Sequence, residues 1–289
     1  MTRRILIVAN PHRPETLEAA VLAASALEAE GVSVCHDFHR GIDKPIDAAL
    51  VLGGDGTMLH AADMTRGTGI ALLGVNLGRV GFLAELERDD VAHAARRLAQ
   101  GDYEVEERGT IDVTVTAPDG TVSTGWAVNE AAVERANLRT TVEVALDIDN
   151  RPLSTFGCDG VVVATSTGST AHAFSAGGPV LWPDVDALLV VPLAAHALFS
   201  RPLVVSPDST VAVEILERSA SDGQVVLDGA RAIDVAKGGR VEVRRGAQTV
   251  RLARMSDAPF SERLVKKFSL PVDGFRGERG SGAERGAGI

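Results

Sequence analysis

The sequence is poor in cysteine, in aromatic residues and in long hydrophobic runs. Two cysteines in 289 residues cannot supply a disulfide framework, and aromatic residues make up 4%. The first residues, Met1-Thr2-Arg3-Arg4, do not have the pattern of a signal peptide. The longest apolar stretch, near 187–199, is interrupted by Pro192 and His196 and is too short to span a bilayer. These absences predict a cytoplasmic protein with no membrane partner.

Two common nucleotide-binding signatures are also missing. Without a Gly-x4-Gly-Lys-Ser/Thr sequence there is no P-loop, and without Gly-x-Gly-x-x-Gly there is no dinucleotide fingerprint. The formal net charge of −10 argues against a nucleic-acid partner, which would require a basic face. The seven histidines form no recognisable ligand set, so we predict no metal site built from protein ligands.

What is present indicates a globular protein with a substantial core, since 45% of the residues are hydrophobic and 24% are charged. The first hundred or so residues alternate between strand and helix patterns, which is typical of a parallel sheet covered by helices. We expect strands at 4–10, 32–35, 48–52 and 70–75, and helices at 14–30, 57–66 and 89–100.

After this region the pattern changes to short alternating strands separated by turns such as Pro118-Asp119-Gly120. Strands and turns at this spacing predict a β-sandwich. The expected fold is therefore an α/β N-terminal domain with a parallel sheet, followed by an all-β, sandwich-like C-terminal domain. We place the domains at 1–105 and 106–255, followed by a segment (256–274) that returns to the first domain and a disordered tail (275–289).

The most informative motif follows the expected strand at 48–52 and consists of Gly53, Gly54, Asp55, Gly56 and Thr57. Glycines at a helix N-terminus expose successive N–H groups, which attract phosphate. A carboxylate beside bound phosphates suits proton removal from a hydroxyl, or holding a metal. The motif therefore predicts phosphoryl transfer. The structural alternative is a tight strand-to-helix turn with Asp55 as a cap.

A second cluster runs from Cys158 to His172, where a strand of valines leads into hydroxyl and glycine residues. Small hydroxyl residues and backbone N–H groups can bond a purine edge and approach phosphates closely. The alternative is a Ser/Thr-rich loop that caps a helix starting near Ser169. Between the two clusters, Asn129-Glu130 ends a strand with an amide beside a carboxylate.

Taken in order, these motifs resemble those of the bacterial NAD kinases. The matching segments are Gly53–Thr57, Asn76–Leu83, Asn129-Glu130, Asp159-Gly160, Thr167–Ala171, Ser175–Pro179, His196–Pro202 and Asp228-Gly229. The resemblance implies a kinase that transfers the γ-phosphate of ATP, or phosphate from polyphosphate, to the adenosine-ribose 2′-hydroxyl of NAD. It also implies a cleft between the two domains and a homodimer or homotetramer. Phosphoryl transfer needs charge neutralisation, which without a P-loop lysine implies Mg²⁺ with ATP.

The resemblance also implies a role for each matching residue. Asp55 would activate the 2′-hydroxyl as the catalytic base, and Gly53, Gly54, Gly56 and Thr57 would bind the phosphates. The NAD-binding positions would be Phe82, Asn129, Glu130, Asp159, Thr167, Thr170, Ala171, His172 and Ser175. Asp159 matches a carboxylate that can reach the NAD of a neighbouring subunit.

Two positions depart from the pattern of many relatives, which have proline at Ser166 and tyrosine at His172. Serine lacks the fixed φ of proline, and histidine offers less stacking area than tyrosine together with a titratable edge. Two other functions stay open. One is a lipid or sugar kinase that shares the glycine turn, and the other is a non-catalytic nucleotide-binding sensor on the same fold.

Overall fold

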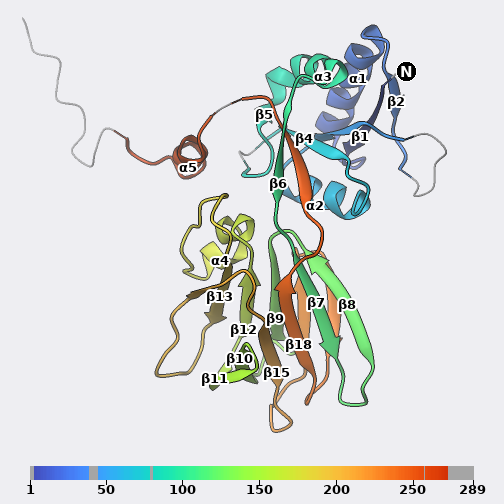
Figure 1. Cartoon of the computed structure of the whole chain (residues 1–289). Helices are drawn as coiled ribbons and strands as arrows, with labels where there is room; N and C mark the ends of the chain where they lie inside the picture. The colour runs from blue at the N-terminus through green and yellow to red at the C-terminus, as the bar shows by residue number, and fades with distance from the viewer. Residues whose placement is uncertain (1–2, 39–44, 79–80, 257, 273–289) are drawn as a thin grey trace, which may run out of the picture. The chain divides into compact units, whose positions relative to one another are not determined.

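The computed structural model describes residues 3–38, 45–78, 81–256 and 258–272 (Figure 1). The chain divides into two compact units, one ending at Met255 and the other beginning at Ser256. The first unit contains three sheets, and the second contains one described helix.

The first sheet is mostly parallel, with strand order β2-β1-β3-β4-β19-β6, and β5 pairs with β4. Only the β19–β6 pairing is antiparallel among its described strand pairs. Strands β3 and β4 are buried throughout, as is usual for parallel strands covered on both faces. The strands are β1 (Arg4–Ala9), β2 (Ser33–Cys35), β3 (Ala48–Leu52), β4 (Ala71–Asn76), β5 (Leu86–Glu87), β6 (Glu104–Arg108) and β19 (Val250–Arg254).

Helices cover both faces of this sheet. Helices α1 (Pro14–Ala29) and α3 (Val91–Gln100) pack on one face, where Leu27 and Leu98 lie in one cluster with Leu50. A short 3₁₀ turn (Arg88–Asp90) precedes α3. Helix α2 (Asp55–Met64) lies on the other face, and its Met58 packs with Val51.

The remaining strands form two six-stranded antiparallel sheets with a common core of valine, leucine and isoleucine (Figure 1). One sheet contains β7 (Ile111–Thr116), β8 (Val122–Ala127), β10 (Val142–Ile148), β11 (Arg151–Cys158), β15 (Val211–Ile215) and β18 (Arg240–Arg245). The other contains β9 (Glu130–Arg135), β12 (Gly160–Ala164), β13 (Leu188–Leu193), β14 (Leu203–Val205), β16 (Gly223–Leu227) and β17 (Arg231–Val235). A 3₁₀ turn (Thr167–Thr170) and the short helix α4 (His172–Ser175) follow β12.

The predicted fold class, α/β followed by an antiparallel β-sandwich, is confirmed. One helix start was predicted wrongly, because α2 begins at Asp55 and not at Thr57. Gly54 is the extended residue before the helix, and Asp55 and Gly56 already belong to its first turn. A carboxylate in the first turn interacts favourably with the helix dipole, which offsets the low helix propensity of glycine.

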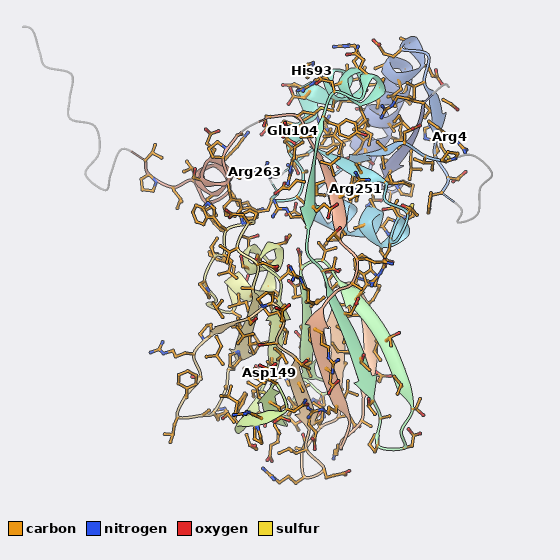
Figure 2. All side chains as sticks on the ribbon, viewed as in Figure 1. Arg4, His93, Glu104, Asp149, Arg251 and Arg263 are labelled. Atoms are coloured by element: carbon orange, nitrogen blue, oxygen red, sulfur yellow. The ribbon has the colours of Figure 1, made fainter. Side chains whose placement is uncertain are left out.

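Two strands connect the predicted domains in a way that the sequence pattern does not reveal. Strand β6 spans the predicted boundary at 105, and β19 lies in the range given to the β-rich domain. Both strands belong to the first sheet, where β19 pairs with β4 and β6. Figure 2 shows the side chains along them, with Glu104 labelled at the start of β6 and Arg251 labelled on β19.

The second unit contains helix α5 (Phe260–Phe268), which matches the helical pattern at these positions. That the segment 256–274 returns to the first domain stays a prediction, and the tail predicted at 275–289 lies outside the described residues. No described helix combines the length and the apolar character needed to cross a membrane.

Candidate active site at the start of helix α2

The glycine motif forms a tight connection from β3 into α2. The N–H groups of Thr57 and Met58 donate to the carbonyl of Gly54, at 2.9 and 3.2 Å. The amides of Asp55 and Gly56 therefore precede the first intrahelical bonds, in the position where helices bind anions. A Cβ on Gly54 or Gly56 would have no atom within 4 Å, so their side of the turn is open.

Gly53 is required by the turn itself. Its φ of +154° is rarely adopted by other residues, and a Cβ there would lie 2.3 Å from Oγ1 of Thr57. The side chain of Thr57 thus folds back over Gly53. This contact sets the direction in which the chain enters α2.

The carboxylate of Asp55 is held by the backbone of the segment after β4. Oδ1 accepts the N–H groups of Phe82 and Leu83 at 3.0 and 2.9 Å, and Oδ2 shares the Phe82 N–H at 3.0 Å. A Cβ on Gly81 would lie 2.1 Å from Oδ1, so only glycine fits against this carboxylate. Each carboxylate oxygen has about two acceptor positions, which leaves Oδ2 with capacity for a hydroxyl.

The prediction that Asn129-Glu130 ends a strand is wrong, because β8 ends at Ala127 and the pair lies where β9 begins. Both side chains are buried, with 7% and 6% of their residue surface exposed. The carboxylate of Asp228 accepts the backbone N–H groups of Val128 and Asn129 at 2.9 and 2.7 Å, which fixes the chain before Glu130. Asp228 and Gly229 both have positive φ in the turn between β16 and β17, as a type I′ turn requires.

The pKa of Glu130 is raised to about 7, mainly by burial and in addition by the nearby carboxylate of Asp228, against the opposite effect of a hydrogen bond from the backbone of His172. Oε2 of Glu130 is buried without a hydrogen-bond partner among the described residues. Burial also raises the pKa of Asp228, against the effect of its backbone amide donors and Arg231. A buried carboxylate with an unused acceptor is suited to a ligand hydroxyl.

The raised pKa of Glu130 predicts a pH-dependent cost to folding. The folded state keeps this proton up to about pH 7, whereas a free glutamate loses it near 4.5. Stability is therefore highest below the unfolded pKa and falls as pH rises towards the folded pKa. Glu130→Gln removes this cost. We compare the free energies of unfolding of the variant and the parent, measured in urea. The difference in favour of the variant should be larger at pH 8 than at pH 5.5 by about 2 kcal/mol. An equal difference at both pH values would contradict the raised pKa.

The Thr165–Ala171 loop packs directly against Asn129. The N–H of Thr165 donates to the carbonyl of Asn129 at 2.9 Å, and Oγ1 of Thr165 donates to the carbonyl of Val128 at 2.7 Å. A Cβ on Gly168 would lie 2.0 Å from the Asn129 carbonyl oxygen. Asn129 and the Thr165–Ala171 loop, which are separated in the sequence, thus lie next to each other.

Four other NAD-binding candidates belong to this loop or follow it, whereas Asp159 lies at the other end of β12. Thr167 and Thr170 form the 3₁₀ turn, where Oγ1 of Thr170 donates to the Thr167 carbonyl at 3.1 Å. Ala171 joins this turn to α4, and Ser175 is exposed at the end of α4. Asp159 forms an ion pair with Arg135 at 2.5 Å. The NAD contacts of these residues stay predictions.

The two departures from the family pattern have clear local settings. The backbone φ of Ser166 is −58°, which proline also adopts, and its hydroxyl donates to the carbonyl of Val185. The side chain of His172 is 37% exposed, and its Nδ1 lies 4.0 Å from Oε1 of Glu134. Phe82 is 7% exposed and supplies its backbone amide to Asp55.

Helix α2 is anchored to the second domain at its other end. The carboxylate of Asp63 accepts hydrogen bonds from Nε1 of Trp126 at 3.2 Å and from Nη1 of Arg231 at 2.7 Å. Nη2 of Arg231 also bonds Asp228 at 3.0 Å. Polar contacts thus lead from the end of α2 to the carboxylate that holds the Asn129 backbone. Val128 and Met58 share one hydrophobic cluster nearby.

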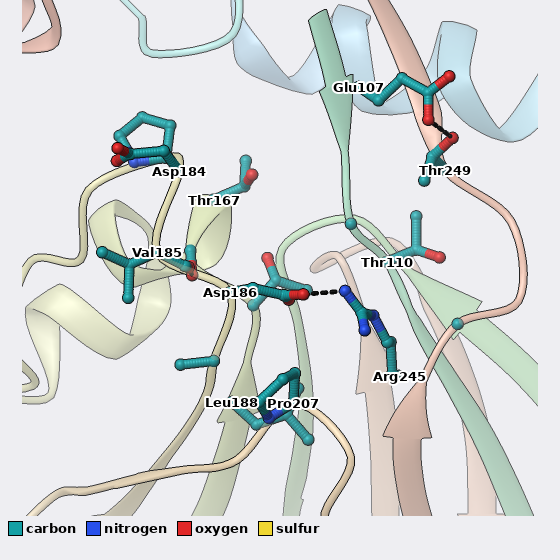
Figure 3. Close-up of a pocket in the computed structure, with 16 residues that line it drawn as sticks. Glu107, Thr110, Thr167, Asp184, Val185, Asp186, Leu188, Pro207, Arg245 and Thr249 are labelled. Carbon is teal, nitrogen blue, oxygen red and sulfur yellow. Dashed lines mark hydrogen bonds and ion pairs between the residues drawn. The ribbon is translucent and has the colours of Figure 1, made fainter.

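A cavity of about 280 Å³ adjoins the same loop (Figure 3). Thr165, Ser166 and Thr167 line one side of it, and Arg245, which is ion-paired with Asp186, lies at another. Its lining does not include Asp55 or Glu130. Of the candidate site residues, the cavity is therefore adjacent only to Thr167.

Four residues that organise these sites were not predicted from the sequence, namely Gly81, Leu83, Asp228 and Arg231. Gly81, Leu83 and Asp228 belong to segments that match the family motifs, but motif membership alone does not show which backbone groups they fix. Arg231 lies 168 positions from its partner Asp63, and no local pattern indicates such a contact.

Together, the strand–glycine turn–helix connection, the carboxylate held at its start and the neighbouring buried pair are features of a phosphoryl-transfer enzyme. Residues 28–103 match the family model of the ATP-NAD kinase N-terminal domain, and residues 128–255 match that of the ATP-NAD kinase C-terminal domain. The chain belongs to the ATP-NAD kinase family.

Curated relatives match over nearly the whole chain. The NAD kinase of Corynebacterium diphtheriae is 48% identical over 299 residues, covering 96% of this chain and 94% of the relative. That of Leifsonia xyli is 51% identical over 298 residues, covering 96% and 98%.

Solved structures of the same fold also match. The yeast NADH kinase complexed with NADH has a TM-score of 0.85 at 21% identity and covers 96% of this chain and 90% of that one. An NAD kinase from Archaeoglobus fulgidus in complex with ATP has a TM-score of 0.72 at 25% identity, covering 94% and 100%.

Proposed function

We propose that this protein transfers the γ-phosphoryl group of ATP to the 2′-hydroxyl of the adenosine ribose of NAD, forming NADP and ADP. The observation that carries the proposal is the carboxylate of Asp55 at the start of α2. The backbone amides of Phe82 and Leu83 hold it, and Oδ2 has acceptor capacity left. A ribose hydroxyl is a weak nucleophile at neutral pH, and a positioned base accelerates its attack by about 10²–10⁴-fold.

In the proposed step, Oδ2 of Asp55 takes the proton of the 2′-hydroxyl while the oxygen of that hydroxyl attacks the γ-phosphorus. The bond from that phosphorus to the β,γ-bridging oxygen breaks, and ADP leaves with the electron pair. The amides at the start of α2 face the phosphates, and the open side of Gly54 and Gly56 leaves room for them. Glu130 and Asn129 hold the ribose and diphosphate region.

The described residues contain no group of three or more His, Cys, Asp or Glu side chains arranged to hold a metal. Mg²⁺ would enter as part of the substrate, bound to the phosphates of ATP, where it would neutralise their charge. Polyphosphate as an alternative donor, a cytoplasmic location, and a homodimer or homotetramer in which Asp159 reaches the neighbouring subunit's NAD belong to the same proposal.

The deciding experiment is an assay of the purified protein with Mg·ATP and a panel of NAD, NADH, diacylglycerol and fructose 6-phosphate. We expect NADP from NAD and no phosphorylation of the lipid or the sugar. A second arm replaces ATP with polyphosphate. Nucleotide binding without any product would support the non-catalytic sensor, and a phosphorylated lipid or sugar would support the other kinase classes.

Glu130→Gln is expected to weaken NAD binding by about tenfold at pH 8, because a charged acceptor bonds a hydroxyl more strongly than an amide does. The difference should shrink at pH 6, where Glu130, with a pKa of about 7, is mostly protonated. Calorimetric titration with NAD at both pH values measures it. Unchanged affinity at pH 8 would remove Glu130 from the site.

A further inference from the structure

Arg254, the last residue of β19, contacts the segment that holds Asp55. Its side chain is buried, and Nη1 donates to the carbonyl of Leu83 at 3.2 Å. The N–H of the same Leu83 donates to Oδ1 of Asp55 at 2.9 Å. Arg254 and Asp55 therefore hold one residue through its carbonyl and its amide.

The guanidinium of Arg254 is itself fixed by two carboxylates. Nε donates to Oε2 of Glu106 on β6 at 2.5 Å, and Nη1 lies 3.9 Å from Oε2 of Glu85. Oε1 of Glu85 also accepts the N–H of Met255 at 3.1 Å, so the chain at the end of β19 is bound to the chain beyond Leu83. Planar, two-sided pairing of this kind gives arginine a defined orientation.

The segment also has an anchor on β4. The N–H of Glu85 donates to the carbonyl of Gly74 at 3.1 Å, and a Cβ on Gly74 would lie 2.7 Å from Cα of Ala84. These contacts fix where the segment lies. The orientation of the Leu83 peptide groups depends in addition on the bond from Arg254.

Burial of Arg254 is costly for stability alone. Nη2 is buried without an acceptor among the described residues, and an unsatisfied buried N–H lowers the stability of the folded state. An apolar side chain would avoid that cost but would leave the carboxylates of Glu85 and Glu106 without this partner. The two ion pairs and the bond to Leu83 together account for an arginine at this position.

We propose that Arg254 is a positioning residue for Asp55, acting through Leu83 to keep the two amides aimed at the carboxylate. Without the bond from Arg254 to the Leu83 carbonyl, the backbone at Leu83 would reorient. Its N–H would then no longer hold the carboxylate of Asp55 in a fixed direction. The expected loss of kcat rests on the proposed function, whereas the ordering of the Leu83 amide rests on geometry alone.

The test compares Arg254→Met with Arg108→Met. Arg108 is a matched control, since it is similarly buried and pairs with the same Glu106, at 2.7 Å, whereas the bond to the Leu83 carbonyl is made by Arg254. We expect kcat of Arg254→Met to fall about 10–30-fold with KM for NAD within twofold, and kcat of the folded Arg108→Met to stay within twofold. Equal losses in the two variants would overturn the proposal.

A double-mutant cycle separates positioning from general destabilisation. If Arg254 acts through Asp55, then Arg254→Met should lower kcat in the parent but hardly at all in the Asp55→Asn background. The same fold loss in both backgrounds would overturn the proposal. Should Arg254→Met fail to fold, Arg254→Lys replaces it in the cycle, because one ammonium cannot reproduce the forked contacts to Glu106 and Leu83.

Hydrogen exchange supplies a readout that needs no activity. In Arg254→Met the amides of Phe82 and Leu83 should exchange at least tenfold faster than in Arg108→Met at matched global stability. Unchanged exchange would refute the positioning role even if NADP is formed. Faster exchange without NADP in the parent would leave the geometry intact and reject only the proposed function.

Discussion

Asp55→Asn is expected to lower kcat about a hundredfold or more while NAD affinity stays nearly unchanged. The asparagine carbonyl can accept the Phe82 and Leu83 amides as Oδ1 does, and only the second bond, which the Phe82 N–H shares with Oδ2, is lost. The amide nitrogen that replaces Oδ2 cannot take a proton from a hydroxyl, so the contribution of a general base, about 10²–10⁴, is lost. Steady-state kinetics with saturating Mg·ATP, together with calorimetry for NAD, measures both quantities.

Near-normal turnover of Asp55→Asn would reject Asp55 as the base. A parallel loss of NAD affinity would instead show that the carboxylate binds substrate. Hydrogen exchange at Phe82 and Leu83 provides the control, since protected amides in the variant demonstrate that only the proton acceptor has changed.

Gly81→Ala should have an effect of similar size through a steric route. The new Cβ would lie 2.1 Å from Oδ1 and 2.7 Å from Cγ of Asp55, so either the carboxylate or the segment must move. A displacement of about 1 Å at a reacting group can cost about a hundredfold in rate. We expect kcat to fall about a hundredfold, while the variant remains folded because Gly81 does not need a positive φ.

Gly157→Ala is the matched control. Gly157 lies on strand β11 of the sandwich, and a Cβ there would contact only Oγ1 of Thr141, at an ordinary van der Waals distance of 3.9 Å. We expect its kcat to remain within twofold of the parent. If Gly81→Ala were as active as Gly157→Ala, the close packing of Gly81 on Asp55 would have no bearing on catalysis.

Local patterns were sufficient to predict the elements around Asp55. The buried run of β3, the three glycines and the helix after them follow from short-range preferences, and the fold class follows from the change of periodicity near 105. The start of α2 was misplaced by two residues, because glycine is a weak helix former unless surrounding contacts hold it in the helix.

Long-range contacts account for what the sequence did not reveal. Asp228 reaches the Val128 amide across 100 positions, and Arg254 reaches Leu83 across 171. A carboxylate in an Asp-Gly turn and an arginine at a strand end are common features with no distinctive spacing. Strand β19 has the same short alternating character as the sandwich strands, so periodicity assigns it to the wrong sheet.

The place of β19 has a consequence for biosynthesis. Leu252 pairs with Leu72, so a strand synthesised near the end of the chain is inserted between β4 and β6, which were made long before. Until it arrives, a nascent or truncated chain ending near 105 leaves the edge of β4 at Leu72 without a strand partner, since β5 pairs only with Val75 and Asn76, and open edges invite aggregation. A fragment that ends near residue 105, expressed alone, should therefore be poorly soluble. Adding a separate peptide that covers β19 would restore only part of the missing sheet.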